Sequence, residues 1–308
     1  MPATTRFPHA GCASRSALTA WLNARQPSTW SRNAVRPEYV IRVVDSGIFI
    51  AYCACMTSVP QPITGIEQFH LLFLDQLGRK LDKGHYALKG GCNLRFYLRS
   101  IRYSEDIDLD VQSTPVDVLR DRVEQILKGV SLARILEARG LAIAQCSAPK
   151  QTETTQRWKL TLTARGSALP LHTKIEFSRP GEGDPVAFGP VDSLLIREYQ
   201  LTPILASHYT PEAAFRQKIN ALIHRSQTQA RDIFDLDHLL RSGVSTQGMA
   251  LPPQWQEAQQ NALAISFDVF KSQVLSFLAP EYQAQYDTPQ VWDDLVLRVV
   301  EAMKGAAA

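Results

Sequence analysis

The sequence predicts an α+β protein, in which a first part that mixes strands and helices is followed by a helical C-terminal half. Two observations support this class. Between residues 85 and 179, short stretches alternate apolar and polar residues, which is the pattern of half-buried strands, and amphipathic helices separate them. From residue 211 onward, the apolar residues recur almost everywhere at helical spacing. The 308 residues suffice for one large domain or two smaller ones.

The composition is that of an ordinary soluble globular protein, with 45% hydrophobic and 20% charged residues. A net charge of +3 is too small to indicate nucleic-acid binding by itself. No apolar run approaches the roughly 20 residues that a membrane-spanning helix needs, so we expect no membrane partner. The five cysteines show neither a CxxC pair nor zinc spacing, and their odd number favours a reducing compartment over a disulfide framework. These features predict a cytoplasmic protein.

Residues 1–55 differ in composition from the rest of the chain. They contain six arginines and no lysine, and their only acidic residues are Glu38 and Asp45. Arginine-rich, acid-poor leaders occur in targeting segments, but a start codon assigned too far upstream, with translation beginning at Met56, is the simpler explanation. We therefore predict a poorly ordered extension over 1–55, a mixed core over 56–200 and a helical domain over 201–308.

The mixed part begins with an amphipathic helix. In ITGIEQFHLLFLDQLGRKL, residues 63–81, apolar side chains recur at helical spacing. HYALKGG, residues 85–91, predicts a short strand that ends in a glycine turn. NLRFYLRS, residues 93–100, predicts a short helix, and DIDLDV, residues 106–111, predicts a second strand.

The later elements follow the same two periods. In the mixed part, helices are predicted at 115–130 and 131–140, and strands at 157–164 and 171–179. The two strands are expected to form a hairpin around Gly166. Residues 179–190 are dense in glycine and proline and predict a loop. Further helices are predicted at 212–225, 231–241, 253–278 and 289–304.

Three aspartates occupy alternate positions of the predicted strand in SEDIDLDV. Because side chains of a strand alternate between its faces, Asp106, Asp108 and Asp110 point one way while the apolar residues between them point into a core. Carboxylates so close repel one another unless something positive lies among them. Hard oxygen ligands suit Mg²⁺, which takes few protein groups and completes its shell with water and phosphate oxygens. Asp106 and Asp108 are therefore candidate metal ligands.

Two other interpretations of these aspartates need weighing. An EF-hand loop also begins with DxDxD, but its sixth position requires glycine and its twelfth glutamate, whereas this chain has Val111 and Asp117 there. A solvated edge strand could carry acids merely to stay soluble. The aspartates alone do not exclude the edge strand, but the glycine pair ahead of them favours a site.

Gly90 and Gly91 end one predicted strand and precede a short basic helix. Glycines at such a turn let backbone N–H groups approach a phosphate, and the N-terminus of a helix attracts anions. A glycine pair alone is a weak signal. Followed by a helix and a strand that opens with DxD, it predicts a phosphate-binding loop beside a metal site, and a nucleoside triphosphate needs both.

The stretch KGGCNLRFYLRSIRYSEDIDLDV resembles the core motif of the AbiEii/AbiGii toxin family, nucleotidyltransferase-like proteins on the fold shared with DNA polymerase β and MenT-type toxins. The matching motif residues are Gly90, Gly91, Leu94, Arg95, Arg102, Ser104, Asp106 and Asp108. The resemblance implies a polymerase-β-like nucleotidyltransferase core with a mixed sheet, and phosphates near Gly90, Gly91, Arg95 and Ser104. Cys92 departs from the pattern, because many members have Thr or Ser there and a thiol is the weaker hydrogen-bond partner.

Two downstream stretches extend the resemblance to roughly residues 66–240. In polymerase-β-like folds a third carboxylate comes from a later strand beside the DxD strand, and Glu176 in HTKIEFSR is the best candidate. The alternative is that Lys174 and Glu176 form ordinary cross-strand pairs with residues of neighbouring strands.

The second stretch is FRQKINALIHRSQTQARDIFDLDHLL, where similar toxins depend on a lysine and a following aspartate, here Lys218 and Asp232. Lys218 could neutralise triphosphate charge, and Arg231 with Asp232 could orient the nucleotide or hold two helices together. For Arg225 and Asp235, structural salt bridging is an equally good explanation.

The resemblance implies a metal-dependent nucleotidyltransferase toxin of a toxin–antitoxin or abortive-infection (phage-defence) system, which transfers NMP from an NTP to an RNA acceptor. The 3′ end of tRNA is the natural guess for the acceptor, and a cognate antitoxin is the implied partner. Two Mg²⁺ ions would be held by Asp106, Asp108 and Glu176. The predicted catalytic residues are Asp106, Asp108, Lys218 and Asp232, and the predicted nucleotide-binding residues are Gly90, Gly91, Arg95, Ser104, Lys218 and Arg231. A phosphotransferase that modifies a protein, with Ser104 as a candidate acceptor, and a non-catalytic nucleotide-binding module stay open as alternatives.

Overall fold

The computed structural model describes residues 40–44, 47–51, 62–180 and 184–307. The chain divides into two units, Met1–Thr57 and Ser58–Ala308. In the described part of the first unit, strands β1 (Val40–Val44) and β2 (Gly47–Ala51) pair as an antiparallel hairpin. The rest of the expected N-terminal extension, including Met56 as an alternative start, lies outside the described residues.

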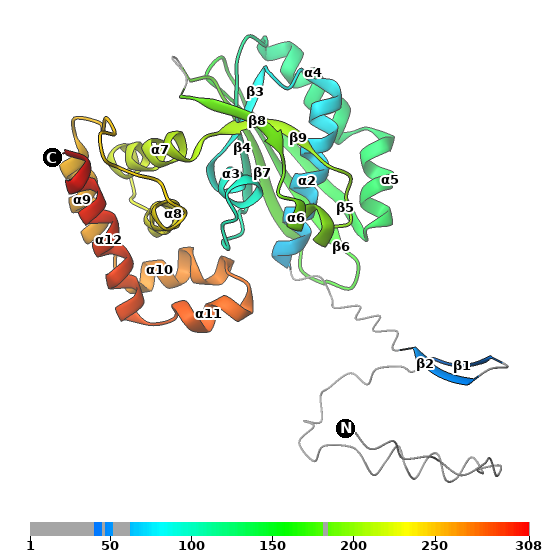
Figure 1. The fold of residues 1–308 in the computed structure, drawn as a ribbon. Coiled ribbons are helices and arrows are strands. Elements are labelled where there is room, and N and C mark those ends of the chain that lie inside the picture. Colours follow the sequence, from blue (N-terminus) through cyan, green and yellow to red (C-terminus); the bar gives the residue numbers. More distant parts are fainter. Residues whose placement is uncertain (1–39, 45–46, 52–61, 181–183, 308) are drawn as a thin grey trace, which may run out of the picture. The chain divides into compact units, whose positions relative to one another are not determined.

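The described part of the second unit contains a seven-stranded mixed sheet (Figure 1). Its strands, in spatial order, are β5 (Leu141–Gln151), β6 (Thr155–Ala164), β7 (Leu171–Ser178), β4 (Asp106–Val111), β3 (Tyr86–Lys89), β9 (Leu205–Tyr209) and β8 (Val186–Pro190). The pairs β4–β7 and β3–β9 are parallel, and the other neighbours are antiparallel. The predicted mixed sheet is confirmed, and the aspartate strand β4 lies at its centre.

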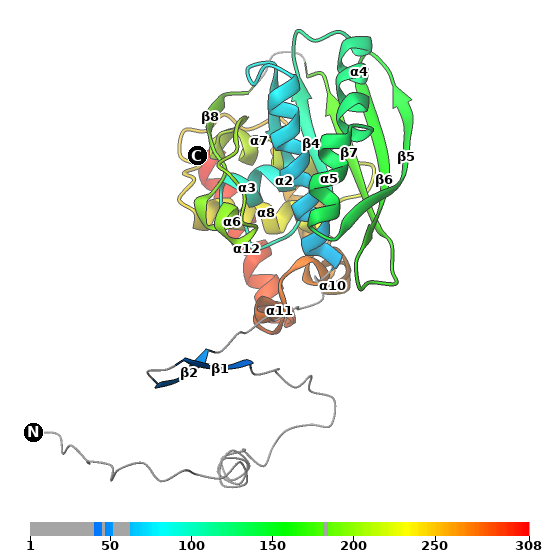
Figure 2. The ribbon, with the colours of Figure 1, turned by 90° about the vertical axis from the view of Figure 1, so that its right-hand side faces the viewer.

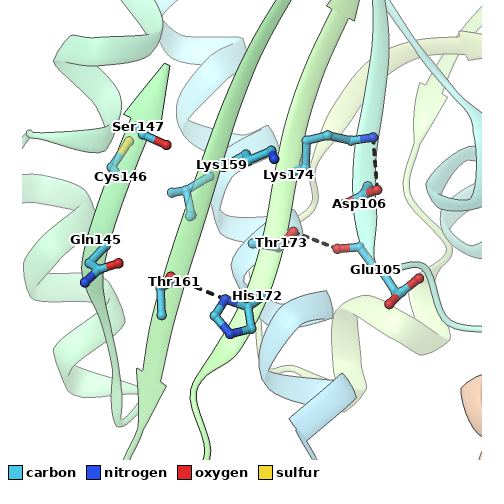
Figure 3. A pocket seen from close by; sticks show the side chains of 11 residues that line it. Glu105, Asp106, Gln145, Cys146, Ser147, Lys159, Thr161, His172, Thr173 and Lys174 are labelled. Atoms are coloured by element: carbon cyan, nitrogen blue, oxygen red, sulfur yellow. Dashed lines mark hydrogen bonds and ion pairs between the residues drawn. The ribbon is translucent and has the colours of Figure 1, made fainter. Parts of the chain in front are cut away.

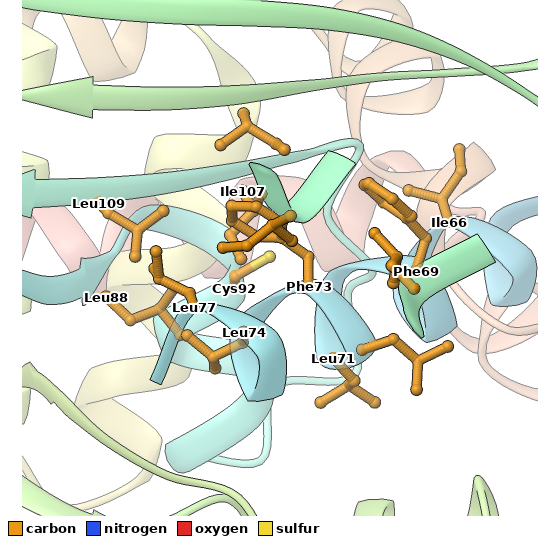
Figure 4. Close-up of a cluster of buried hydrophobic side chains, with 14 of the residues drawn as sticks. Ile66, Phe69, Leu71, Phe73, Leu74, Leu77, Leu88, Cys92, Ile107 and Leu109 are labelled. Carbon is orange, nitrogen blue, oxygen red and sulfur yellow. The ribbon is translucent and has the colours of Figure 1, made fainter. Parts of the chain in front are cut away.

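One face of the sheet is covered by helices α2 (Pro62–Lys80), α4 (Val116–Leu127) and α5 (Val130–Ala138) (Figures 1 and 2). Phe69, Phe73 and Leu77 of α2 recur at helical spacing and lie against Ile107 and Leu109 of β4 (Figure 4). All these side chains are fully buried, and burying each one stabilises the fold by roughly 1.5–3 kcal/mol. This packing orients β4, because its alternate side chains must then point to the opposite face of the sheet.

The short helix α3 (Gly90–Tyr97) connects β3 to β4 and contacts two separate cores. Cys92 and Phe96 belong to the core under the sheet, whereas Leu94 belongs to the core of the helical half. The glycine turn is therefore held from both sides. The predicted helix begins three residues earlier than expected, at Gly90, because a positive φ of 64° at this glycine lets the helix follow the strand directly.

The C-terminal half is helical, as predicted. Beyond the sheet, the elements are α7 (Pro211–His224), α8 (Ala230–Arg241), α9 (Trp255–Leu263), α10 (Phe267–Gln273), the 3₁₀ turn η1 (Leu275–Phe277), α11 (Pro280–Tyr286) and α12 (Pro289–Ala307). Their core includes Phe270 and Trp292, whose rings stack with centroids 4.7 Å apart. The prediction of one continuous helix over 253–278 is wrong. The hydroxyl of Ser266 accepts a hydrogen bond from the backbone N–H of Val269 and starts α10 as a separate helix.

The strand predictions succeed where the alternation is regular. β6 and β7 form the predicted hairpin, with Gly166 at φ 83° in its turn. The prediction of a loop over 179–190 is wrong at its end, where β8 forms the edge of the sheet beside β9 and short helix α6 (Ser193–Glu198) follows. β5 was not predicted because two register shifts interrupt its pairing and most of its side chains are exposed. In the described part of the chain, no helix is long and apolar enough to cross a membrane.

Candidate active site

The carboxylates of β4 lie on the sheet face opposite α2, in register with a polar stretch of β7. Asp106 pairs with Lys174 and Asp108 with Glu176 across the parallel ladder. Because paired positions of neighbouring strands share a face, these four side chains project together. The sheet thus assembles Asp106, Asp108 and Glu176, the three residues that the sequence predicted as metal ligands.

Basic side chains lie among these carboxylates. The Nζ atom of Lys174 is 3.1 Å from Oδ2 of Asp106 and 3.6 Å from Oε2 of Glu176 (Figure 3 shows the Asp106 contact). Nε of Arg157 on β6 donates to the same oxygen of Glu176 at 2.5 Å. Burial alone would lower the pKa of Lys174, but the carboxylates of Asp106, Asp108 and Glu176 raise it. The repulsion expected among these carboxylates is therefore relieved by Lys174 and Arg157.

Asp108 is the exception, because it makes no hydrogen bond or ion pair within the described part of the chain. Burial raises its pKa, and the charges of Asp106 and Glu176 add to this rise, whereas those of Lys174 and Lys89 oppose it. A metal ion bound to its carboxylate would supply the direct contact that neither lysine makes. Mg²⁺ needs only one or two protein carboxylates, so Asp106 and Asp108 fit this ion. Among the described residues, no group of three His, Cys, Asp or Glu side chains is arranged to hold a metal ion, and Glu176 is engaged with Arg157 and Lys174.

Asp110, on the same face of β4, has a different environment. Its carboxylate accepts hydrogen bonds from Nζ of Lys89 at 2.5 Å and from the hydroxyl of Tyr209 at 2.7 Å. Lys89 also donates to the hydroxyl of Ser178 at 2.7 Å. Asp110 is 5% exposed, and its partners join β3, β4, β7 and β9. Its contacts are those of a structural residue.

The glycine turn lies directly against this site. A Cβ atom on Gly90 would be 3.0 Å from Oδ2 of Asp108, and one on Gly91 would be 2.6 Å from Oγ of Ser104. The hydroxyl of Ser104 donates a hydrogen bond to the backbone carbonyl of Asp106 at 2.9 Å. The backbone of both glycines and the side chain of Ser104 therefore surround the start of β4. This is where the family resemblance implies a bound phosphate.

Cys92 is directed away from any phosphate. Its side chain is 1% exposed, and its thiol donates to the carbonyl of Asp106 at 3.2 Å. Sγ also lies 3.6 Å from Nδ1 of His70, whose Nε2 is 2.7 Å from Oγ1 of Thr173. Thr173 in turn donates to the carbonyl of Glu105 at 2.7 Å. Cys92, where many family members have Thr or Ser, therefore contacts the buried side of β4 and does not face the proposed phosphate.

The guanidinium of Arg95 is bound by other protein groups and makes no contact with Asp106 or Asp108 among its hydrogen bonds and ion pairs. Its guanidinium donates to both oxygens of Glu67 at 2.7 and 3.2 Å and to the carbonyl of Ser100 at 3.0 Å. It also lies over the ring of Tyr103, 4.4 Å from the centroid. These contacts fill the donors of Arg95 with protein groups, and we do not carry it into the proposed nucleotide site.

The predicted residues of the helical half form a buried network. Nζ of Lys218 on α7 is 2.9 Å from Oδ1 of Asp232 and 2.7 Å from Oδ2 of Asp235, both on α8. Arg225 reaches the other oxygen of Asp232 at 3.0 Å. Arg102, which precedes β4, binds Asp235 through two hydrogen bonds of 3.0 and 2.8 Å.

This network ends at the glycine turn, because Nη2 of Arg102 lies 3.0 Å from where a Cβ of Gly91 would be. Arg231 stays outside it. Its Nε donates to Gln229 at 2.7 Å, and it forms no ion pair within the described part of the chain. The pKa of Glu105 is raised by burial and by Asp106, and the charge of Arg231 opposes this rise. Arg231 is thus a half-exposed cation on the side of the site where Glu105 lies.

Two basic residues of the site, Lys174 and Arg157, were not predicted from the sequence. For Lys174 a signal exists, because it stands two residues before Glu176 on an alternating strand and therefore shares the carboxylate face. Arg157 gave no such signal, because its contact with Glu176 depends on the register of the β6–β7 hairpin.

A mixed sheet with paired carboxylates on its central strand and a glycine turn beside them is an arrangement expected of a nucleotidyltransferase. Residues 72–292 match the family described as "Nucleotidyl transferase AbiEii toxin, Type IV TA system". The chain belongs to this AbiEii family of nucleotidyltransferase toxins, which confirms the resemblance seen in the sequence.

Solved structures similar to this chain include JHP933 from Helicobacter pylori, at 17% identity and a TM-score of 0.48 over 80% of this chain and 92% of that one. MenT4, the nucleotidyltransferase toxin Rv2826c from Mycobacterium tuberculosis H37Rv, has 15% identity and a TM-score of 0.49 over 79% of this chain and 91% of that one. A comparison with curated protein sequences found no match.

Proposed function

We propose that this chain transfers a nucleoside monophosphate from an NTP to an RNA acceptor and that the transfer depends on Mg²⁺ held by Asp106 and Asp108. The observation that carries the proposal is Asp108, which makes no hydrogen bond or ion pair within the described residues and lies beside Asp106 and against the backbone of Gly90. A metal-bound triphosphate needs carboxylates and free backbone N–H groups within one small space. The start of β4 offers the carboxylates, and the first turn of α3 offers N–H groups without a partner inside the helix.

In the proposed reaction, a hydroxyl oxygen of the acceptor attacks the α-phosphorus of the NTP. A new P–O bond forms, the bond to the bridging oxygen breaks, pyrophosphate leaves and the hydroxyl proton is released to solvent. Mg²⁺ bound at Asp106 and Asp108 would lower the pKa of the hydroxyl and neutralise charge on the leaving group. Glu176 would help to hold a second ion and would then give up its contact with Lys174.

The remaining residues are proposed to hold the nucleotide. The backbone of Gly90 and Gly91 and the hydroxyl of Ser104 border the space beside the carboxylates, and Arg231 offers a cation at its edge. Lys218 and Asp232 are proposed to act indirectly. Their charges are satisfied inside the buried network, which reaches the turn through Arg102. We therefore propose both as positioning residues for the glycine turn.

Membership in the family supports a cognate antitoxin as partner. A role in abortive infection and the 3′ end of tRNA as acceptor are parts of the proposal that rest on the resemblance, and the proposed cytoplasmic location rests on the cysteine content and the composition.

The test is transfer of α-³²P-labelled NTPs to total cellular RNA in the presence of Mg²⁺. The full chain is compared with its Asp106→Ala/Asp108→Ala variant, and Asp110→Asn serves as a matched control on the same strand. Label on RNA with the wild type and Asp110→Asn, but not with the double variant, supports the proposal. If folded wild-type protein labels no RNA with any of the NTPs, the proposal is wrong. Label transferred from γ-³²P-ATP to protein would indicate a phosphotransferase instead.

A further inference from the structure

An open groove of about 770 Å³ runs from the candidate active site across the neighbouring strands (Figure 3). Glu105 and Asp106 line one end, and the rest of the groove lies over β7, β6 and β5. None of the nucleotide-binding residues proposed above lines it. The groove adjoins the carboxylates on the side away from the glycine turn. Because the NTP is proposed to bind at the glycine turn, the acceptor would have to reach the carboxylates from another side such as this one.

Lys159 is the free cation of this groove. It lies directly opposite Lys174 in the β6–β7 ladder, and both side chains face the groove. Lys174 is held by Asp106 and Glu176, whereas Lys159 is exposed and forms no ion pair within the described residues. A lysine on a rigid strand without a carboxylate partner is available to an anionic ligand.

The groove wall beyond Lys159 carries hydrogen-bonding groups. Thr161 and His172 face each other, with Oγ1 of Thr161 3.3 Å from Nδ1 of the imidazole. Gln145 and Ser147 of β5 line the opposite side. Phe, Tyr and Trp are not among the lining residues described, so bases would not be sandwiched between aromatic rings. This chemistry suits a ligand rich in phosphates and hydroxyls.

The shape of β5 argues against a peptide in the same place. Register shifts between Ile143 and Gln145 and between Ser147 and Lys150 interrupt its ladder beside the groove. Such irregularities bend a strand and disfavour the pairing of an added strand. A nucleic acid is a flexible chain with regularly spaced charges and does not need to pair with a regular edge strand. The irregular β5 therefore favours a nucleic acid over an extended polypeptide as the ligand.

We propose that this groove binds the 3′-terminal nucleotides of a single-stranded RNA acceptor, with Lys159 on a backbone phosphate and the terminal hydroxyl directed toward Asp106. This inference rests on the proposed nucleotidyl transfer and adds the path by which the acceptor reaches it. Contacts through Lys159, Thr161 and His172 reach phosphate and sugar, so the groove would select single strands without strong preference for sequence.

The test measures binding of a short 5′-fluorescein-labelled single-stranded RNA to the full chain by fluorescence anisotropy, with DNA of the same sequence alongside. The variants are Lys159→Ala and Lys159→Glu. Lys80→Glu is the matched control, because Lys80 is also an exposed lysine but lies at the end of α2, which covers the opposite sheet face. We expect Lys159→Ala to weaken RNA binding about tenfold and Lys159→Glu to weaken it further. The slope of log K against log salt should fall by about 0.7, the value for one phosphate contact on a single strand.

Kinetics separate this inference from the proposed function. Lys159→Ala should raise KM for the RNA while kcat and KM for the NTP stay close to wild type. The Asp106→Ala/Asp108→Ala variant should bind the RNA but transfer nothing. RNA binding that is equal in wild type, Lys159→Glu and Lys80→Glu would overturn the groove and leave the transfer reaction standing. Binding that depends on Lys159 without any transfer would overturn the proposed function instead. Preference for DNA, or labelling of protein only, would show that RNA is not the ligand.

Discussion

Arg102 and Asp235 form a bidentate ion pair between the segment that precedes β4 and helix α8 of the helical half. Nε and Nη2 of Arg102 donate to the two carboxylate oxygens of Asp235, and the two side chains are 5% and 0% exposed. Burial alone would raise the pKa of Asp235, but Arg102 and Lys218 lower it to about 2. Because Arg102 also lies beside Gly91, this pair couples the helices to the glycine turn.

The first prediction concerns this pair. Arg102→Ala leaves the charge of Asp235 buried and less compensated, and we expect it to lower the free energy of unfolding by about 3–5 kcal/mol. Urea denaturation followed by circular dichroism measures the loss. Arg79→Ala is the control, since Arg79 forms an exposed pair with Asp75 on α2 and should cost less than about 1 kcal/mol. Equal losses in the two variants would contradict a structural role for the Arg102–Asp235 pair.

The second prediction distinguishes positioning from direct binding at Lys218. Lys218→Met removes the lysine that bridges Asp232 and Asp235 and leaves each buried carboxylate with one arginine, so we expect about 3 kcal/mol of destabilisation together with a raised KM for NTP. Adding Asp232→Asn removes one of these two less compensated charges. A double-mutant cycle should therefore show a coupling of about 1–3 kcal/mol, and KM for NTP should recover in part. If stability recovers while KM does not, Lys218 contacts the triphosphate itself.

Much of the site could be predicted because its chemistry is local in sequence. The glycine pair, Ser104 and the two aspartates lie within one short stretch, and the strict alternation of β4 determines which face the aspartates occupy. Glu176 was implied by the family resemblance, and the alternation of β7 places it on the same face as Lys174. The structure places these residues side by side, as their periodicity requires.

The partners of these residues could not be predicted, because they depend on register and on packing over long distances in sequence. Arg157 meets Glu176 only through the hairpin register, and Arg102 meets Asp235 across 133 positions. Arg95 shows the limit of transferring a motif. Its basic charge suggested a phosphate contact, yet the buried Glu67 of α2 takes its guanidinium. Sequence alone identified the chemical groups better than it identified what neutralises them.

The third prediction concerns the metal. Asp106→Asn and Asp108→Asn should each weaken binding of Mn²⁺, used as a spectroscopic substitute for Mg²⁺, at least about tenfold, because each removes one hard oxygen ligand of a small set. Electron paramagnetic resonance counts the free ion without any enzymatic reaction. Asp110→Asn should leave binding nearly unchanged, since Lys89 and Tyr209 already hold that carboxylate.

Lys174→Met offers an independent check on the same site. Its ammonium neutralises Asp106 and Glu176 where a metal would otherwise do so, and we expect its removal to tighten Mn²⁺ binding. Weakening by Asp110→Asn as large as that by Asp106→Asn would show that the metal lies elsewhere on β4.

The fourth prediction concerns the glycine turn. Gly91→Ala would place a methyl group 2.6 Å from Oγ of Ser104, so the turn or the serine has to move. We expect a loss of about 1–3 kcal/mol in stability and weaker NTP binding by calorimetry. Gly189→Ala on β8 is the control, because its Cβ would find its nearest neighbour at 3.7 Å. NTP binding that stays unchanged in Gly91→Ala would remove this turn from the nucleotide site.

The last prediction uses pH to test the buried contacts behind β4. Burial lowers the pKa of His70 to about 3, from an ordinary value of 6.5. Below pH 6.5 the unfolded chain therefore takes up a proton at this residue while the folded chain does not, and the folded state loses stability as the pH falls. The slope is at most about 1.4 kcal/mol per pH unit.

His70→Gln keeps a side-chain donor for Thr173 but does not titrate. Its free energy of unfolding at pH 7 should be below that of the wild type, because the imidazole packs closely and contacts Cys92. Since carboxylates such as Asp235 destabilise both proteins in acid, the informative quantity is the difference in unfolding free energy between the two. We expect this difference to shrink as the pH is lowered from about 7 to 5, by up to about 2 kcal/mol. A difference that stays constant over this range would mean that His70 is protonated or solvated in the folded protein, and that the start of β4 is held in some other way.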